Sequence, residues 1–541
     1  MDQSTVYLAG DVDAIKDFVF ETSSLPQIRG GSELLQECEE EIRKRFRKYV
    51  IYCAGGSFLL EVPAHQADEI RKDIEKIYLE KTLVATVTVV VEQNRPEMAG
   101  SQPPHSLEGW AERLWRATED IPKDRGLAHR LAILQGQMQE AKTARVIAPF
   151  YEAFPFGRRC ERCGRRMAQD REPIEDGKAL CAVCKRRDER GRSRSDREGE
   201  REIRGEFNRE FQKRYREKVR AEQPQDLDTL VQSARRNYLA FLYADGNDIG
   251  KLLRRIQSRE HYQAVSRALI NGTQEALYRA LWEVCSPELQ RPDRVWPFEI
   301  INIGGDDVIV LIQAGYAWEV AVKFLEYFEI EVNNRLKQNL PNAAQQRITA
   351  SCGIAIADVK YPVRYLERLA SDLLKEAKKR AKENPENPQS AVTFLWLTSP
   401  IASEKAQPLM GFYQRGRDVR LTARPYILEN ARILGEIARE IHGWPRATRH
   451  RWMEALQRGV LLSASFIRYD LAREEKAGKE KVELLKRLAD VVAADASVPV
   501  IWPIWHQVKE GNRFLWRTAL LDAMELAELH AMRPDAKEPE G

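Results

Sequence analysis

Two glycine-pair turns constrain the fold of this chain more than any other feature. The first is Gly55-Gly56 and the second is Gly304-Gly305, and each lies between two short apolar segments. Apolar runs on both sides of a glycine turn predict a β-hairpin. Around each hairpin, the apolar periodicity predicts a strand and a helix before it and a helix and a strand after it. The expected strands are residues 4–8, 49–53, 58–62, 83–91, 238–244, 298–303, 308–312, 347–357 and 392–397, with helices over 33–48, 66–80, 259–284, 316–337 and 363–383.

Strand, helix, hairpin, helix and strand is the ferredoxin-like order. The sequence therefore predicts an α+β multidomain protein in which one topology occurs twice. We expect the first ferredoxin-like domain over 1–92 and a helical domain with a zinc ribbon and a charged segment over 93–236. The second ferredoxin-like domain is expected over 237–402, followed by a helical C-terminal domain over 403–541.

The second unit carries three aspartates where its strands end. Asp245 closes the first strand, and Asp306 and Asp307 directly follow the glycine pair. We expect the first strand and the hairpin's first strand to be neighbours, so that Asp245 faces the other two. Carboxylates this close repel one another unless a cation lies between them. The pattern predicts a catalytic site in which Mg²⁺ or Mn²⁺ ions act on a triphosphate. A glycine turn without chemistry is the alternative interpretation.

The candidate substrate contacts are small or basic residues around these acids. Glycines let a backbone approach a phosphate closely, lysines suit the triphosphate, and a serine on the following helix suits the base. For each lysine, an ordinary surface position is the alternative. The candidates are Gly246, Asn247, Gly304, Gly305, Ser266, Lys360 and Lys378.

The first unit keeps the glycine turn but has no acids in its hairpin. Asp11 and Asp13 follow its first strand, with no carboxylate expected opposite. We therefore expect a non-catalytic copy, which completes a composite nucleotide pocket or holds the shape of the catalytic unit.

Four of the eight cysteines form two C-x-x-C pairs, Cys160 with Cys163 and Cys181 with Cys184. This spacing fits a zinc ribbon. Four thiolates close a tetrahedral site, so the Zn²⁺ should be structural rather than catalytic. A redox-active pair is the alternative.

Charge and composition set the expected surroundings. Hydrophobic residues make up 43% of the chain and the net charge is +4, which excludes a mainly disordered protein. The sequence has no apolar run long enough for a membrane span and no signal-peptide pattern at its start, so we expect a cytoplasmic protein without a membrane partner. Residues 185–220 hold 15 Lys and Arg against 9 Asp and Glu, which suits either a solvated helix or a surface for RNA phosphates or a partner.

These motifs resemble the large polymerase/cyclase subunit of type III CRISPR effector complexes. The matching stretches are Gly10-Asp11-Val12, Arg29-Gly30-Gly31-Ser32, residues 54–58, Pro149-Phe150-Tyr151-Glu152, Asp245-Gly246-Asn247, residues 304–307, residues 351–355 and Lys360-Tyr361-Pro362. The resemblance implies two palm domains, with Asp245, Asp306 and Asp307 as the metal ligands of the second. It also implies ATP as substrate, cyclic oligoadenylate as product, and guide RNA, target RNA and other subunits as partners.

In one respect the sequence departs from that family. Many members begin with a histidine-aspartate nuclease domain, whereas no His-Asp dipeptide occurs among the eight histidines. We therefore expect a variant without that nuclease. Two other functions remain open: a dinucleotide cyclase that uses other nucleotides, and a scaffold that binds ATP and RNA–protein partners without turnover.

Overall fold

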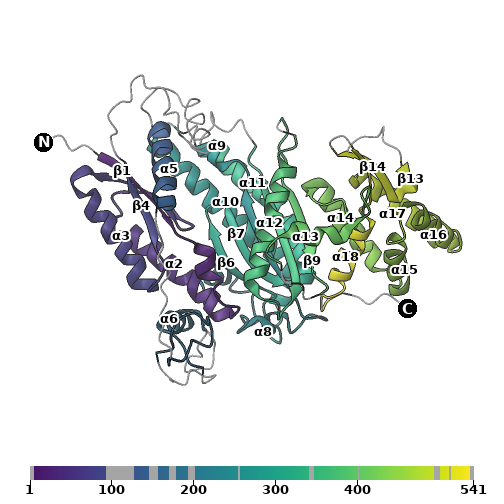
Figure 1. Cartoon of the computed structure of the whole chain (residues 1–541), viewed down its shortest axis with the longest axis horizontal. Coiled ribbons are helices and arrows are strands. Elements are labelled where there is room, and N and C mark those ends of the chain that lie inside the picture. The colour runs from purple at the N-terminus through teal and green to yellow at the C-terminus, as the bar shows by residue number, and fades with distance from the viewer. Residues whose placement is uncertain are drawn as a thin grey trace.

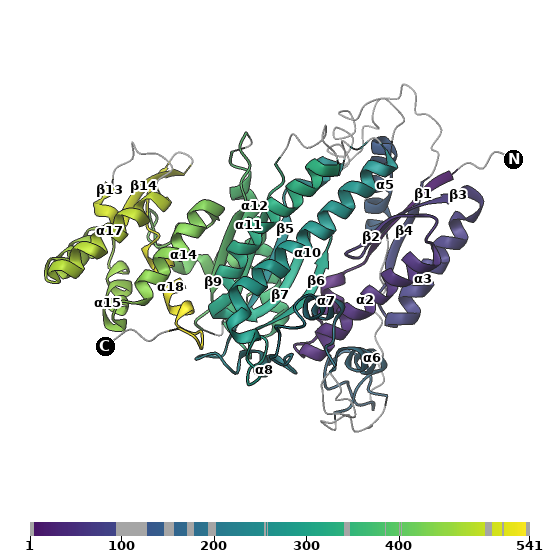
Figure 2. The same cartoon turned by 180° about the vertical axis from the view of Figure 1, so that it is seen from behind.

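The computed structural model describes residues 5–92, 127–144, 156–169, 178–192, 202–253, 256, 258–339, 347–384, 386–399, 401, 403–492, 500–510 and 513–536. The molecule is elongated, with the N-terminal palm at one end, the second palm in the middle and the C-terminal domain at the other end (Figure 1). A small lobe around α6 (Ala182–Gly191) projects from the N-terminal palm below α2 (Leu25–Arg45) (Figures 1 and 2). Part of the helical domain expected over 93–236, including the Pro149–Glu152 stretch and part of the charged segment over 185–220, lies outside the described residues.

The first palm has the predicted ferredoxin-like topology. Its four strands lie in the order β2-β3-β1-β4, with antiparallel pairing throughout. Helix α2 begins earlier than expected, because a proline at its first turn starts the helix at residue 25. The elements are β1 (Thr5–Val12), α1 (Ile15–Val19), α2 (Leu25–Arg45), β2 (Val50–Ala54), β3 (Ser57–Pro63), α3 (Ala67–Thr82) and β4 (Val87–Val91).

The second palm repeats this topology and extends it. Its strands lie in the order β12-β9-β8-β5-β7-β6, in which β8-β5-β7-β6 is the ferredoxin-like part. Strand β9 adds in parallel to β8, and the short β12 pairs with β9. The elements are β5 (Tyr238–Gly246), α9 (Ile249–Leu253), α10 (Arg259–Leu289), β6 (Phe298–Gly304), β7 (Asp307–Gln313), α11 (Ala314–Asn339), β8 (Ala350–Asp358), α12 (Val363–Ala381), β9 (Ala391–Trp396) and β12 (Tyr426–Ile427).

One expected strand neighbour is wrong. The first strand, β5, pairs with the second strand of the hairpin, β7, and not with its first strand, β6. The helical crossover through α10 carries the chain past β5 to the edge of the sheet, and the hairpin then returns β7 to the centre. The aspartates still meet, because Ala244 pairs with Val308 and the next residues are Asp245 and Asp307.

The segment between the palms holds short helices that pack on both of them. Helix α5 lies against β1 and β4, and α7 lies against β6. Helix α6 packs against α2 so closely that a Cβ on Gly30 would lie 1.9 Å from the carbonyl oxygen of Arg187. The helices are α5 (Leu127–Ala144), α6 (Ala182–Gly191), α7 (Glu206–Arg214) and α8 (Leu227–Val231).

We expected a helical C-terminal domain, and this expectation is wrong in part. The domain also contains a five-stranded sheet in the order β10-β11-β15-β14-β13. In the sequence, Gly511-Asn512 lies between residues 505–510 and 513–517, and this dipeptide is a hairpin-turn signal that the sequence analysis missed. The elements are α13 (Ala406–Met410), β10 (Gln414–Arg415), β11 (Val419–Arg420), α14 (Leu428–His442), α15 (Arg446–Leu456), α16 (Val460–Ala472), α17 (Glu475–Val492), β13 (Val500–Ile501), β14 (Trp505–Glu510), β15 (Arg513–Arg517) and α18 (Leu520–His530). Among the described residues, no helix combines the length and the apolar character that crossing a bilayer requires.

Candidate active site

The three aspartates gather at one end of the second palm's sheet. Side chains alternate along a strand, so Tyr243 and Asp245 share a face of β5. Asp307 lies on the same face of the neighbouring strand β7, next to Asp245 in the ladder. Helices α10 and α11 cover the opposite face, and α12 and the first palm flank the face of the aspartates (Figures 1 and 2). The prediction that Asp245 meets Asp306 and Asp307 is thus confirmed in the structure.

Two of these aspartates, Asp306 and Asp307, have a raised pKa. Burial raises the pKa of Asp306 to about 7, and the charge of Asp245 and a hydrogen bond with its carboxylate add to the rise. Burial also raises the pKa of Asp307 well above its usual range, with Asp306 and Asp245 as further causes. A divalent cation between the three groups would remove this repulsion, so the acids fit a metal site.

The glycines around the acids give the carboxylates their room. A Cβ on Gly246 would lie 2.7 Å from an Asp306 carboxylate oxygen, and one on Gly304 would lie 2.2 Å from an Asp307 oxygen. Gly305 has φ +76°, a conformation that other residues rarely adopt. The glycines are therefore needed to position the aspartate side chains, whether or not they also let a phosphate come close to the backbone.

Lys378 is the expected lysine that the structure brings to the aspartates. It lies on α12, and its ammonium group forms an ion pair with Asp245 and a hydrogen bond of 3.1 Å to the carbonyl oxygen of Gly246. A triphosphate would compete with Asp245 for this positive charge, and a metal ion would compete with Lys378 for the Asp245 carboxylate.

Lys360 is placed elsewhere, and its expected role as a triphosphate contact is wrong. It follows β8, whose residue Asp358 pairs with Tyr238 at the far end of β5 from Asp245. Its side chain is exposed and forms an ion pair of 2.6 Å with Asp228. The topology separates Lys360 from the aspartates because β8 runs antiparallel to β5.

Asn247 and Ser266 are both buried in the packing of the second palm. The Asn247 amide donates to Thr349 at 2.9 Å and accepts from Ser351 at 2.9 Å, which holds the end of β5 against β8. Ser266 lies on the buried side of α10, one turn beyond Tyr262. Asn247 therefore positions Asp245, and contact between Ser266 and a base would need α10 to shift.

The two glycine hairpins touch each other. A Cβ on Gly55 of the first palm would lie 2.8 Å from the Cα atom of Gly304, and one on Gly304 would lie 2.9 Å from the Cα atom of Gly55. Backbone contact this close requires glycine on both sides. The hairpin without acids therefore supports the hairpin with acids.

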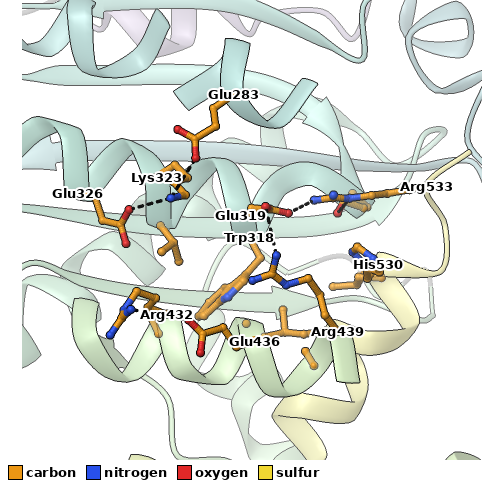
Figure 3. Close-up of a pocket in the computed structure, with 18 residues that line it drawn as sticks. Glu283, Trp318, Glu319, Lys323, Glu326, Arg432, Glu436, Arg439, His530 and Arg533 are labelled. Atoms are coloured by element: carbon orange, nitrogen blue, oxygen red, sulfur yellow. Dashed lines mark hydrogen bonds and ion pairs between the residues drawn. The ribbon is translucent and has the colours of Figure 1, made fainter. Parts of the chain in front are cut away.

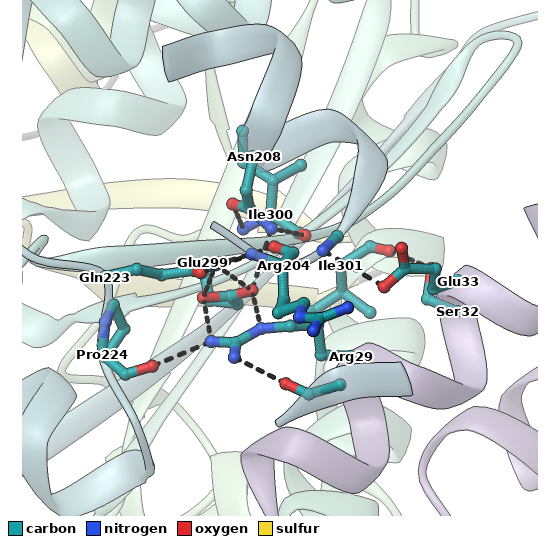
Figure 4. A network of polar contacts seen from close by, with 12 residues as sticks. Arg29, Ser32, Glu33, Arg204, Asn208, Gln223, Pro224, Glu299, Ile300 and Ile301 are labelled. Carbon is teal, nitrogen blue, oxygen red and sulfur yellow. Dashed lines mark hydrogen bonds and ion pairs between the residues drawn. The ribbon is translucent and has the colours of Figure 1, made fainter. Parts of the chain in front are cut away.

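A buried polar network also joins the palms (Figure 4). Arg29 of α2 donates to both carboxylate oxygens of Glu299 on β6, at 2.6 and 2.8 Å. Asn208 donates to the same carboxylate at 2.9 Å, and the Ser32 hydroxyl donates to the carbonyl oxygen of Ile301 at 2.5 Å. Both partners of the ion pair are almost fully excluded from solvent, with 1% and 0% of their side chains exposed. The network fixes β6, the strand that leads into the hairpin with the two aspartates.

Two cavities adjoin the hairpins. One of about 110 Å³ lies between the palms and is lined by Lys16, Gly55 and Asp307 among others. The other, of about 310 Å³, is lined by Tyr52 and Tyr262, whose rings lie 6.4 Å apart. A Cβ on Gly305 would lie 3.3 Å from the Tyr52 hydroxyl, so the larger of these two cavities adjoins the catalytic turn.

A cavity of about 440 Å³ lies between α11, α14 and α18 (Figure 3). Its charged side chains largely pair with each other: Lys323 lies 3.1 Å from Glu283, and Arg533 lies 2.7 Å from Glu319. Because α11 covers the face of the sheet opposite to the aspartates, this cavity is a cleft between domains and not part of the site.

The four cysteines form a second candidate metal site. Their sulfur atoms all lie within 4.8 Å of one another, and within the described residues no other group of three or more His, Cys, Asp and Glu side chains is gathered so closely. The three aspartates are not gathered this closely. Hydrogen bonds with Cys163, Cys181 and Cys184 lower the pKa of the Cys160 thiol, whereas hydrogen bonds with Cys160, Cys163 and Cys181 raise the pKa of the Cys184 thiol. Thiols that compete for protons in this way fit a tetrahedral Zn²⁺ site.

Comparison with known proteins agrees with this site. Residues 238–385 match the family profile of Cas10/Cmr2, second palm domain. No curated protein sequence matches the chain. The fold is similar to crystal structures of a Csm1–Csm4 cassette in complex with cA4 and with pppApA, each with a TM-score of 0.51 and 13% identity. The match covers 98% of this chain and 70% or 69% of the other chain.

At this identity the structural similarity shows the fold, and the family profile identifies the second palm. The absence of a nuclease domain stays a prediction. The resemblance inferred from the motifs is confirmed: residues 238–385 are similar to the second palm domain of Cas10/Cmr2, within a fold similar to that of Csm1 in the Csm1–Csm4 cassette.

Proposed function

We propose that this chain synthesises cyclic oligoadenylates from ATP as a subunit of a type III CRISPR effector complex. The observation that carries the proposal is the cluster of Asp245, Asp306 and Asp307, whose mutual repulsion needs a cation. The Cas10/Cmr2 second palm gives this cluster its family context, and related cassettes have been crystallised with cA4 and pppApA.

The residues suggest how the reaction is arranged. The three aspartates would hold two Mg²⁺ or Mn²⁺ ions, which in such sites activate a hydroxyl nucleophile and stabilise the leaving pyrophosphate. Lys378 would pass from Asp245 to the negative charge of the bound triphosphate. The 310 Å³ cavity beside Gly305, with Tyr52 and Tyr262 in its wall, would take the second nucleotide. The first palm then contributes half of a composite pocket.

The test is ATP turnover by the full chain with its co-purifying subunits, with products identified by mass. The matched control is the double variant Asp306→Asn/Asp307→Asn, which keeps the side-chain shapes and removes two repelling charges, so its stability should not fall. We expect cyclic oligoadenylate from the wild type and none from the variant.

The alternatives give different results in the same assay. A dinucleotide containing other bases would indicate the dinucleotide cyclase. No product from folded, zinc-loaded complex with complementary RNA present would refute the synthase and favour the scaffold.

We further propose that guide and target RNA control this activity through the complex. The basic segment over 185–220 is the part of the sequence that suits RNA phosphates. Adding complementary RNA should raise turnover, and turnover by the isolated chain that RNA and partner subunits leave unchanged would contradict this coupling.

A further inference from the structure

One lysine of the first palm reaches the catalytic face of the second palm. Lys16 lies on α1, and its ammonium nitrogen is 2.7 Å from the Ser371 hydroxyl and 3.1 Å from a carboxylate oxygen of Glu367. The same nitrogen lies 3.9 Å from the centre of the Tyr243 ring. Tyr243 precedes Asp245 by two residues on the same face of β5, so this lysine borders the metal-binding acids.

The position of Lys16 connects it with both halves of the aspartate cluster. On one side, Glu367 and Ser371 belong to α12, the helix that carries Lys378 to Asp245. On the other side, Lys16 and Asp307 line the same cavity between the palms. Burial raises the pKa of Asp307, and the charge of Lys16 works against this rise.

We propose that Lys16 is a positioning residue by which the first palm sets the metal affinity and the turnover of the second palm. The inference rests on the proposed function of this site and adds a residue that the sequence analysis did not consider. Lys16 holds α12, and with it Lys378, at the correct distance from Asp245. Its positive charge also opposes the binding of a cation by the acids, and it attracts a triphosphate.

A neighbouring contact provides a matched control. Asp17 of α1 pairs with Arg364 of α12 at 3.1 Å, so it joins the same two helices as Lys16 does. This contact lies farther along α12 from Lys378 than the contacts of Lys16 do, and the Asp17 side chain is 57% exposed. If docking of the helices were all that matters, removing either contact would have the same effect.

The experiment measures Mn²⁺ affinity by electron paramagnetic resonance and ATP turnover by product mass, using the full chain in its complex. For Lys16→Met we expect about threefold tighter Mn²⁺ binding, because a nearby positive charge is lost, and about tenfold slower turnover. Lys16→Arg should restore both quantities to near wild type, and Asp17→Asn should change neither. Glu367→Gln should weaken Mn²⁺ binding two- to threefold, because it removes a negative charge instead.

Lys16→Met and Glu367→Gln are thus expected to shift the Mn²⁺ affinity in opposite directions. Loosened packing would instead weaken Mn²⁺ binding in both variants. The proposal is overturned if Lys16→Met leaves Mn²⁺ affinity unchanged or weakens it, or if Asp17→Asn behaves like Lys16→Met. Mn²⁺ affinity needs no turnover, so a wild type that makes no oligoadenylate would refute the proposed function while leaving this inference open to its own test. If Lys16→Met does not fold, Lys16→Gln, which also removes the positive charge, takes its place with the same expected and refuting results.

Discussion

Replacing Arg29 with methionine tests how strongly the first palm stabilises the catalytic unit. The side chain would lose both bonds to Glu299 and the bonds of 2.9 Å to the carbonyl oxygens of Gly191 and Pro224. Glu299 would keep its bonds to Asn208 and Gln223 but lose its counter-charge in a fully buried place. Breaking one side of a buried pair costs about 3–5 kcal/mol, so we expect the free energy of unfolding to fall by that amount.

The double variant Arg29→Met/Glu299→Gln separates the lost charge from the lost packing. The glutamine removes the unpaired carboxylate, so we expect the double variant to recover about 1–2 kcal/mol of the deficit. Lys360→Ala is the matched control for an exposed pair and should cost less than about 1 kcal/mol.

The assay is urea unfolding followed by tryptophan fluorescence, because Trp296 is fully buried on the segment just before Glu299.

The pH dependence of the loss in unfolding free energy gives a second criterion. Burial already raises the pKa of Glu299, and losing Arg29 would raise it further. An acid with a raised folded-state pKa destabilises the fold increasingly as the pH rises above its unfolded value, about 4.3. The deficit should therefore be smaller at pH 5 than at pH 8. A deficit below about 1 kcal/mol at pH 8, or one independent of pH, would refute the reasoning.

Three further predictions concern the metal sites. The Mn²⁺ dissociation constant should rise up to about tenfold for each pH unit below pH 7, because Asp306, with its pKa of about 7, must lose a proton to bind the ion. A constant affinity in titrations at pH 6, 7 and 8 would contradict this prediction. Gly246→Ala should reduce product formation at least about a hundredfold with little change in melting temperature, since the new methyl group would displace the Asp306 carboxylate. Cys184→Ser should abolish bound Zn²⁺ in elemental analysis and lower the melting temperature, and full zinc content in this variant would argue against a four-cysteine site.

The sequence was sufficient to predict what depends on local pattern. Alternating apolar residues and glycine turns predicted both ferredoxin-like units, and the aspartates at the strand ends predicted the acidic cluster. The cluster of four cysteines followed from their spacing alone. Lys378 was one of two candidate lysines, and an exposed position was equally consistent with the sequence.

The errors have physical causes. Lys360 was placed near the aspartates because it follows a strand of the same sheet, but the antiparallel direction of β8 carries it to the opposite end. The sheet of the C-terminal domain was missed because three of its strands, β10, β11 and β13, have only two residues each. Strands that short carry no periodic signal, and their pairing depends on contacts distant in the sequence.

The contact between the two palms could not be predicted from local sequence pattern either. It does explain why the hairpin of the first palm has a glycine pair although it has no acids. The first palm has no acids in its hairpin but has kept both glycines. If these glycines existed only to let a phosphate approach, nothing would oppose their replacement once the acids were absent. The structure supplies another reason, because Gly55 lies against the backbone of Gly304 and any side chain there would push the turn over residues 304–307 away. The glycine turn of the first palm therefore keeps the acidic hairpin of the second palm in its place, although the first palm has no acids in its own hairpin.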